Sequence, residues 1–154
     1  MHDETGFEDY TGHWKGINNL YLSWLDDQLF ASESEAVVAL KANGQFVQFD
    51  YNWTYKDEKQ EGLLVLGIDR ESNAAQVVWT DSWHSKHKFL VSDGALQTDD
   101  TISVLTSYQI GEHPPWGWRT EILKEPNAFQ IVMYNIPPNE EEILAVEMKY
   151  ERAG

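Results

Sequence analysis

Cysteine is absent from the 154 residues of this sequence, and that absence excludes several kinds of chemistry. Disulfide bonds, thiolate zinc sites and a cysteine nucleophile all require a thiol. Basic residues are scarce as well: 11 Lys and Arg stand against 26 Asp and Glu, for a formal net charge of -15. That charge repels the phosphates of nucleic acid, and the one dense basic stretch, Lys86-His87-Lys88, is short. We therefore expect no nucleic-acid partner.

Long apolar runs and linkers are also missing. No run approaches the roughly 18 apolar residues that a membrane-spanning helix needs. The first ten residues are acidic and polar, without the basic and apolar regions of a secretory signal. We expect a cytoplasmic protein with no membrane span. We also expect a flexible segment over residues 1–10 and one folded domain over residues 11–154, because this length fits a single core.

Short β-strand patterns separated by turn signals run through the chain. The predicted strands cover residues 11–24, 36–42, 45–55, 63–68, 75–82, 86–91, 95–98, 102–110, 118–124, 128–136 and 143–152. Asn43-Gly44 and Asp93-Gly94 are predicted turns, and residues 56–61 a charged turn. Only Leu25 to Glu35 fits a short helix, between the first two strands. The short local turns favour an all-β fold, a closed antiparallel up-and-down barrel of about 8–10 strands, over a sandwich.

Alternation along these strands predicts an inside and an outside. In the strand over 45–55 the apolar and aromatic positions alternate with polar ones, so their side chains are expected to face inward. In the last strand Val146, Met148 and Tyr150 share one face. The strand over Leu63 to Leu66 is apolar on both faces. Its outer face is expected to be covered by a partner subunit, as in a homodimer, or by the 25–35 segment.

Several local motifs resemble a known group of barrels. Gly12-His13-Trp14-Lys15-Gly16 resembles the Gly-x-Trp start of the first strand in calycins. Further matching motifs are Gly67-Ile68-Asp69, Trp79-Thr80-Asp81-Ser82, Trp118-Arg119-Thr120-Glu121, Met133-Tyr134 and Tyr150-Glu151-Arg152. Their order resembles an uncharacterised bacterial lipocalin-like family of unknown function, from about Thr11 to Arg152. The resemblance implies a barrel in which Trp14 packs at the closed end under Arg152, and it implies little chemistry.

The aromatic residues are the leading candidates for a binding site. Small barrels either fill with side chains or hold one small ligand. The predicted ligand-binding residues are Phe49, Tyr51, Trp53, Trp79, Tyr108, Trp118, Arg119 and Met133. If Arg119 faces inward, its guanidinium can hold the head group of an acidic ligand. If the other face of this strand points inward, Trp118, Thr120 and Ile122 lie inside the barrel and Arg119 forms an ion pair on the outer surface.

Metal and haem sites are alternatives that rest on histidine. A turn at Ser85 would bring His84 and His87 together, and His113 would complete a three-His zinc or iron site. Loop positions without metal are the competing interpretation, and we expect no metal and no cofactor. His84 is also the one candidate ligand for a haem at the barrel mouth. Trp116, in a loop with two prolines, either gates the mouth or packs on the barrel end.

Hydrolytic and phosphate-binding patterns are not found. Asp81, Ser82 and His84 lie too close along one strand to act as a triad, and neither a Gly-x-Ser-x-Gly elbow nor a Walker loop occurs. The sequence therefore favours a binding protein for a small apolar or amphipathic molecule. A plugged barrel acting as a protein-interaction or structural module is the first alternative. An enzyme or haem binder with its site at the mouth is the second.

Overall fold

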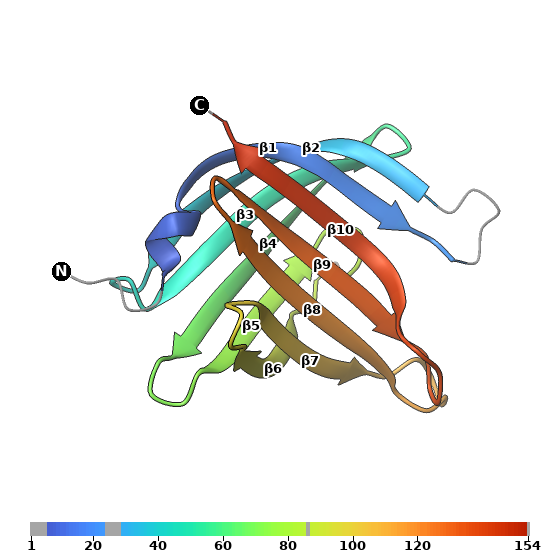
Figure 1. Ribbon diagram of the computed structural model, residues 1–154. Helices are drawn as coiled ribbons and strands as arrows, with labels where there is room; N and C mark the ends of the chain where they lie inside the picture. The colour runs from blue at the N-terminus through green and yellow to red at the C-terminus, as the bar shows by residue number, and fades with distance from the viewer. Residues whose placement is uncertain (1–5, 24–28, 86, 154) are drawn as a thin grey trace.

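The computed structural model describes residues 6–23, 29–85 and 87–153, and these form a closed antiparallel barrel (Figure 1). Its strands are β1 (Gly12–Tyr21), β2 (Leu29–Lys41), β3 (Phe46–Tyr55), β4 (Glu58–Asp69), β5 (Ala74–Asp81), β6 (Leu90–Leu96), β7 (Ile102–Tyr108), β8 (Trp116–Glu125), β9 (Ala128–Ile136) and β10 (Ile143–Arg152). Each strand pairs with its neighbours along the chain, and β1 also pairs with β10. The predicted up-and-down barrel is confirmed.

Tight turns explain why consecutive strands pair. At the turn after β2, Ala42, Asn43 and Gly44 all have positive φ, at 50°, 58° and 82°. Asn and Gly tolerate this backbone region best, so the predicted Asn43-Gly44 turn is confirmed. The turn after β3 needs only Lys56 and Asp57, at φ 47° and 66°, because β4 already begins at Glu58. The predicted charged turn is therefore shorter than residues 56–61.

The predicted turn at Asp93-Gly94 is wrong, because both residues lie inside β6. Gly94 stands opposite Val104 of β7. A Cβ atom on Gly94 would lie 1.9 Å from the carbonyl oxygen of Ser103. Glycine is needed here because the neighbouring strand approaches closely, and not because the chain reverses. The two short strands predicted over 86–91 and 95–98 are replaced by one strand, Leu90–Leu96.

The helical turn of the described chain lies before β1 rather than between β1 and β2. It is the 3-10 turn η1 (Phe7–Tyr10), and its Phe7 and Tyr10 are buried although residues 1–10 were expected to be flexible. The part of the predicted 25–35 helix that the structure describes, Leu29 to Glu35, belongs to β2 and pairs with β1. Residues 25–28 lie outside the described residues. No helix in the described ranges is long and apolar enough to cross a membrane.

The η1 end of the barrel is closed by aromatic packing. The Arg152 guanidinium lies 4.3 Å from the centre of the Trp14 ring, and it donates hydrogen bonds to the carbonyl oxygens of Asp9 and Thr11 at 2.8 and 2.9 Å. The Trp14 indole donates to the carbonyl oxygen of Tyr10 at 2.8 Å. The contact between Trp14 and Arg152, which the family resemblance implied, is thereby confirmed. It holds η1 over this end of the barrel.

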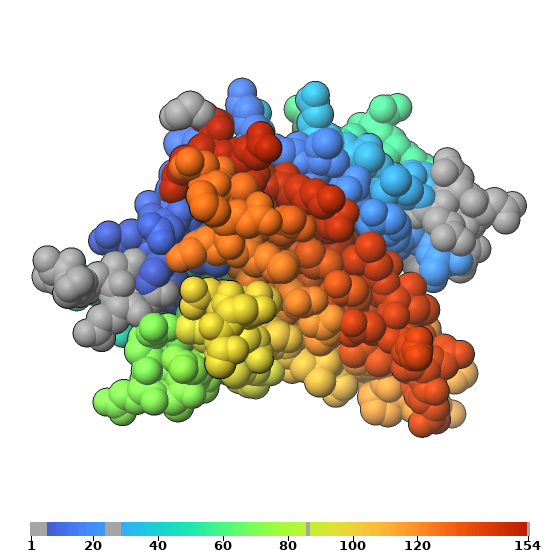
Figure 2. Space-filling model, viewed as in Figure 1, coloured from blue at the N-terminus to red at the C-terminus, as the bar shows by residue number. Residues whose placement is uncertain are grey.

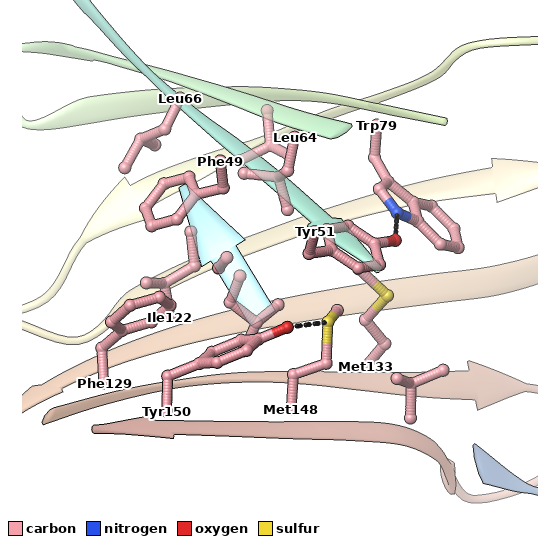
Figure 3. Close-up of a cluster of buried hydrophobic side chains, with 14 of the residues drawn as sticks. Phe49, Tyr51, Leu64, Leu66, Trp79, Ile122, Phe129, Met133, Met148 and Tyr150 are labelled. Carbon is pink, nitrogen blue, oxygen red and sulfur yellow. Dashed lines mark hydrogen bonds between the residues drawn. The ribbon is translucent and has the colours of Figure 1, made fainter. Parts of the chain in front are cut away.

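Aromatic and aliphatic side chains fill the adjoining half of the interior. Phe49 packs edge-on against Tyr10 and Phe129, with ring centres 5.4 Å from each. Figure 3 shows Phe49, Leu64 and Ile122 converging with Phe129 from different strands. Side chains also cover the outer side formed by β8, β9 and β10 (Figure 2). The rings of η1, β3 and β9 thus pack directly against one another in this half of the barrel.

The outer face of β4 carries apolar side chains, as its sequence predicted. Val65 lies opposite Val78 of β5, which lies opposite Val91 of β6. Val65 and Val78 are half-buried, and Val91 is exposed. The described part of the 25–35 segment does not cover them, because it pairs with β1. Cover by a second copy of the chain stays a prediction.

Candidate ligand site at the barrel mouth

The end of the barrel opposite η1 opens into a pocket of about 830 Å³, which we call the mouth pocket. It is lined where β1, β5 and β7 end and where β8 and β10 begin. Aromatic side chains form much of its wall, among them Trp79, Trp83, Tyr108, Trp116 and Trp118. Aliphatic side chains complete it, among them Leu20, Leu22, Ile143 and Leu144. The pocket is therefore apolar over most of its surface.

Two stacked indoles form the inner wall of the mouth pocket. The rings of Trp79 and Trp118 are nearly parallel, with an interplanar angle of 10° and centres 5.4 Å apart. Tyr108 packs edge-on against Trp118 at 6.5 Å, and its hydroxyl donates to Oδ1 of Asn135 at 2.6 Å. Trp118 is 7% exposed. Among the described residues, its indole Nε1 has no hydrogen-bond partner.

His84 lies within a group of indole rings at the pocket wall. Its ring centre is 4.7 Å from Trp83, 5.3 Å from Trp79, 5.8 Å from Trp53 and 6.0 Å from Trp118. The side chain of His84 is 13% exposed. Such packing holds the orientation of the imidazole while one part of it still lines the pocket.

Asp81, which is 1% exposed, is the buried charge behind this wall. Its Oδ2 accepts hydrogen bonds from the Tyr51 hydroxyl at 2.7 Å and from the Trp53 indole at 3.0 Å. Its Oδ1 accepts from the backbone N–H groups of Trp83 and His84 at 2.8 and 3.2 Å, and lies 3.3 Å from Nδ1 of His84. These contacts satisfy the carboxylate, which would otherwise be costly to bury.

The same contacts shift the acidity of the groups around Asp81. Burial by itself raises the pKa of Asp81. The hydrogen bond and charge of His84, together with the Tyr51 hydroxyl and the Trp83 N–H, outweigh burial, so the net pKa lies below 3.8. Burial raises the pKa of Tyr51 well above 10.0, and the nearby Asp81 charge raises it further. Asp81 is thus held as a carboxylate and Tyr51 as a neutral donor.

The chain after β5 forms this arrangement through local hydrogen bonds. Asp81 ends β5, and its carboxylate accepts from the N–H groups two and three residues later, which is an Asx-turn. Ser85 closes the loop, because its hydroxyl accepts from the Asp81 N–H at 3.0 Å. Opposite Asp81, Gly62 leaves room for the Tyr51 ring: a Cβ atom there would lie 2.3 Å from the Tyr51 hydroxyl oxygen.

The residues predicted to bind ligand separate into four groups, of which two lie at the mouth pocket. Trp79, Tyr108 and Trp118 line the mouth pocket. Tyr51 and Trp53 lie behind it as donors to Asp81, and the Trp79 indole donates to the Tyr51 hydroxyl at 2.8 Å (Figure 3).

Phe49, Met133 and Arg119 do not line the mouth pocket. Phe49 and Met133 are fully buried in the core. Arg119 lies on the outer face, where it forms ion pairs with Glu121 at 2.9 Å and Glu142 at 2.7 Å. In β8 the face that points into the barrel is therefore the one with Trp118, Thr120 and Ile122, and not the one with Arg119.

The pairing of Asp81 with His84 was missed by reasoning from a regular strand. The sequence predicted that Asp81 and His84 lie too close along the chain to act together, whereas β5 ends at Asp81 and the following turn folds His84 back onto it. The signal was the run Trp79-Thr80-Asp81-Ser82-Trp83-His84, which is dense in aromatic and polar residues. Within the described ranges no three His, Asp or Glu side chains gather as a metal site.

The fold and the pocket define a closed β-barrel with an aromatic opening at one end. Residues 5–152 match the model of the family described as "Protein of unknown function (DUF1579)", and the chain belongs to that family. Among solved structures it is similar to the crystal structure of Rv2717c from M. tuberculosis, with a TM-score of 0.68 and 12% identity, over 100% of this chain and 99% of that one. This likeness shows a shared fold. Comparison with curated protein sequences found no match.

Proposed function

We propose that this protein binds one small apolar or amphipathic molecule in the mouth pocket. The observation that carries the proposal is the pocket of about 830 Å³ with its wall of indole rings. Ligand pockets typically enclose about 300–1,000 Å³ and are mostly apolar with a few polar groups. Each methylene group that a ligand buries there contributes about 0.8 kcal/mol.

The proposal confines the ligand to one half of the barrel. The other half is filled by Phe7, Tyr10, Trp14, Phe49 and Phe129, each 4% exposed or less. A long chain threaded through the whole barrel would have to displace these rings. The structure therefore favours a compact molecule, bound against Trp118 and the aliphatic side chains at the end of β1 and the start of β10.

The test uses a neutral dye, N-phenyl-1-naphthylamine, and a variant that fills the pocket. We expect the dye to quench tryptophan fluorescence in the wild type and to become brighter, because Trp79 and Trp118 line its site. Ala145→Phe places a ring in the pocket wall and should abolish both signals. Lys15→Phe, at an exposed position of β1 that does not line the mouth pocket, is the matched control and should bind as the wild type does. Equal dye binding by both variants would contradict the proposal.

A further inference from the structure

The mouth pocket differs in charge from the rest of the molecule. Acidic residues outnumber basic ones by 26 to 11 in the whole chain. None of the described residues that line the pocket is Asp or Glu, while Lys88, His84 and His87 all line it. An anion would be repelled by most of this surface, but at the pocket wall it would meet the Lys88 ammonium and no described carboxylate. The charge of the wall therefore favours an anionic ligand group.

His84 has one ring nitrogen directed at Asp81 and the other on the far side of the ring. The described hydrogen bond of the imidazole is made by Nδ1, 3.3 Å from the Asp81 carboxylate. The indoles of Trp79, Trp83 and Trp118 keep the ring from turning. A doubly protonated imidazole donates from both nitrogens, so Nε2 can serve a molecule in the pocket while Nδ1 serves Asp81.

Trp118 supplies a second donor close to His84. Its indole N–H can donate but cannot accept, and it has no partner among the described residues although the side chain is 7% exposed. A buried donor without a partner costs about 1–3 kcal/mol. The ring centres of Trp118 and His84 are 6.0 Å apart. A ligand that carries acceptor oxygens would satisfy the Trp118 donor.

We infer that the ligand of the mouth pocket is an organic acid with an apolar body, whose carboxylate binds His84 and the indole N–H of Trp118. The inference rests on the proposed function and specifies the class of ligand. His84 is then shared by two carboxylates, that of Asp81 and that of the ligand. The apolar body lies against the aliphatic wall, which includes Leu20, Leu22 and Leu144. Charge-assisted hydrogen bonds of this kind are about twice as strong as neutral ones.

Three probes of one shape and different charge test this inference. They are 2-naphthoate, its neutral amide 2-naphthamide and the cation 2-naphthylmethylammonium, measured by calorimetry near neutral pH. We expect the wild type to bind the acid at least about tenfold more tightly than the amide, which corresponds to about 1.4 kcal/mol. The cation should bind most weakly. Equal affinity for acid and amide would overturn the inference and leave the proposed function intact.

Substitutions locate the carboxylate. His84→Gln should reduce the affinity for the acid to that for the amide and leave the amide unchanged. Trp118→Phe keeps a ring without the N–H and should weaken acid binding several-fold, and it also serves if His84→Gln does not fold. His13→Gln, exposed at the closed end, is the control. If His84→Gln and Trp118→Phe both bind acid and amide as the wild type does, the inference is wrong. If no probe binds, and the neutral dye does not bind either, the proposed function itself fails.

Discussion

Removing the Asp81 carboxylate should destabilise the folded barrel. In Asp81→Ala the Tyr51 hydroxyl and the Trp53 indole, which now donate at 2.7 and 3.0 Å, would lose their acceptor inside the protein. Each buried donor left without a partner costs about 1–3 kcal/mol. The loop N–H groups of Trp83 and His84 also lose their acceptor, but they are closer to solvent. We expect a loss of about 3–5 kcal/mol in the free energy of unfolding, a large part of the typical 5–15 kcal/mol.

Urea denaturation followed by tryptophan fluorescence measures this loss, and the slope with urea should stay unchanged. Asp81→Asn keeps the volume but presents an amide N–H₂ toward the same donors, so it should cost about 2–3 kcal/mol. Asp50→Ala, exposed on the outer face of β3, is the control and should change stability by less than about 0.5 kcal/mol. In a double-mutant cycle, Tyr51→Phe should cost less in the Asp81→Ala background than in the wild type. A loss for Asp81→Ala no larger than that of the control would refute the reasoning.

Three further predictions concern stability at acid pH, the closed end of the barrel and the close contact of β6 with β7. The pKa of Asp81 is held below 3.8, so the stability that its ionised form contributes is present above that pH and is lost as the pH falls through the folded-state pKa. When the free energy of unfolding is measured at each pH, its decline below pH 3.8 should therefore be shallower in Asp81→Asn than in the wild type. Arg152→Ala removes the contact at 4.3 Å with Trp14 and two hydrogen bonds that anchor η1, and should cost about 1–2 kcal/mol in urea denaturation, whereas no loss would argue against that anchor. Gly94→Ala places a Cβ atom 1.9 Å from the Ser103 carbonyl oxygen and should lower stability by at least about 2 kcal/mol, a result that an ordinary turn glycine would not produce.

The alternation of side chains predicted most of the interior correctly. Val47, Phe49, Tyr51 and Trp53 all face inward from β3, as their period of two indicates. In β8 the pattern was ambiguous, because a face with Arg119 and Glu121 and a face with Trp118, Thr120 and Ile122 are both compatible with an amphipathic strand. Pairing with β7 and β9 resolves it, since the register places Thr120 between Val104 and Met133, which are buried.

Turn chemistry was less reliable where glycine serves another purpose. Asn43-Gly44 is a turn, and its positive φ angles show why. Asp93-Gly94 has a similar sequence but lies within β6, where the absence of a Cβ atom allows β7 to approach. A sequence does not distinguish a glycine needed for its backbone angles from one needed for its small size, because the second need arises from a neighbouring strand.

The sequence by itself determined the class of fold, since strand periodicity and short turns lead to consecutive antiparallel pairing and a common inner face. It also identified the aromatic residues of the interior, and the resemblance of its motifs to known barrels implied the contact between Trp14 and Arg152. Only the tertiary structure decided which of those rings line a pocket that a ligand can enter. Near η1 the rings of Tyr10, Phe49 and Phe129 pack on one another in the core, whereas at the other end Trp79, Tyr108 and Trp118 line an open pocket beside His84. That difference depends on which side chains meet across the barrel. Such contacts join residues that are far apart along the chain, so no local sequence pattern predicts them.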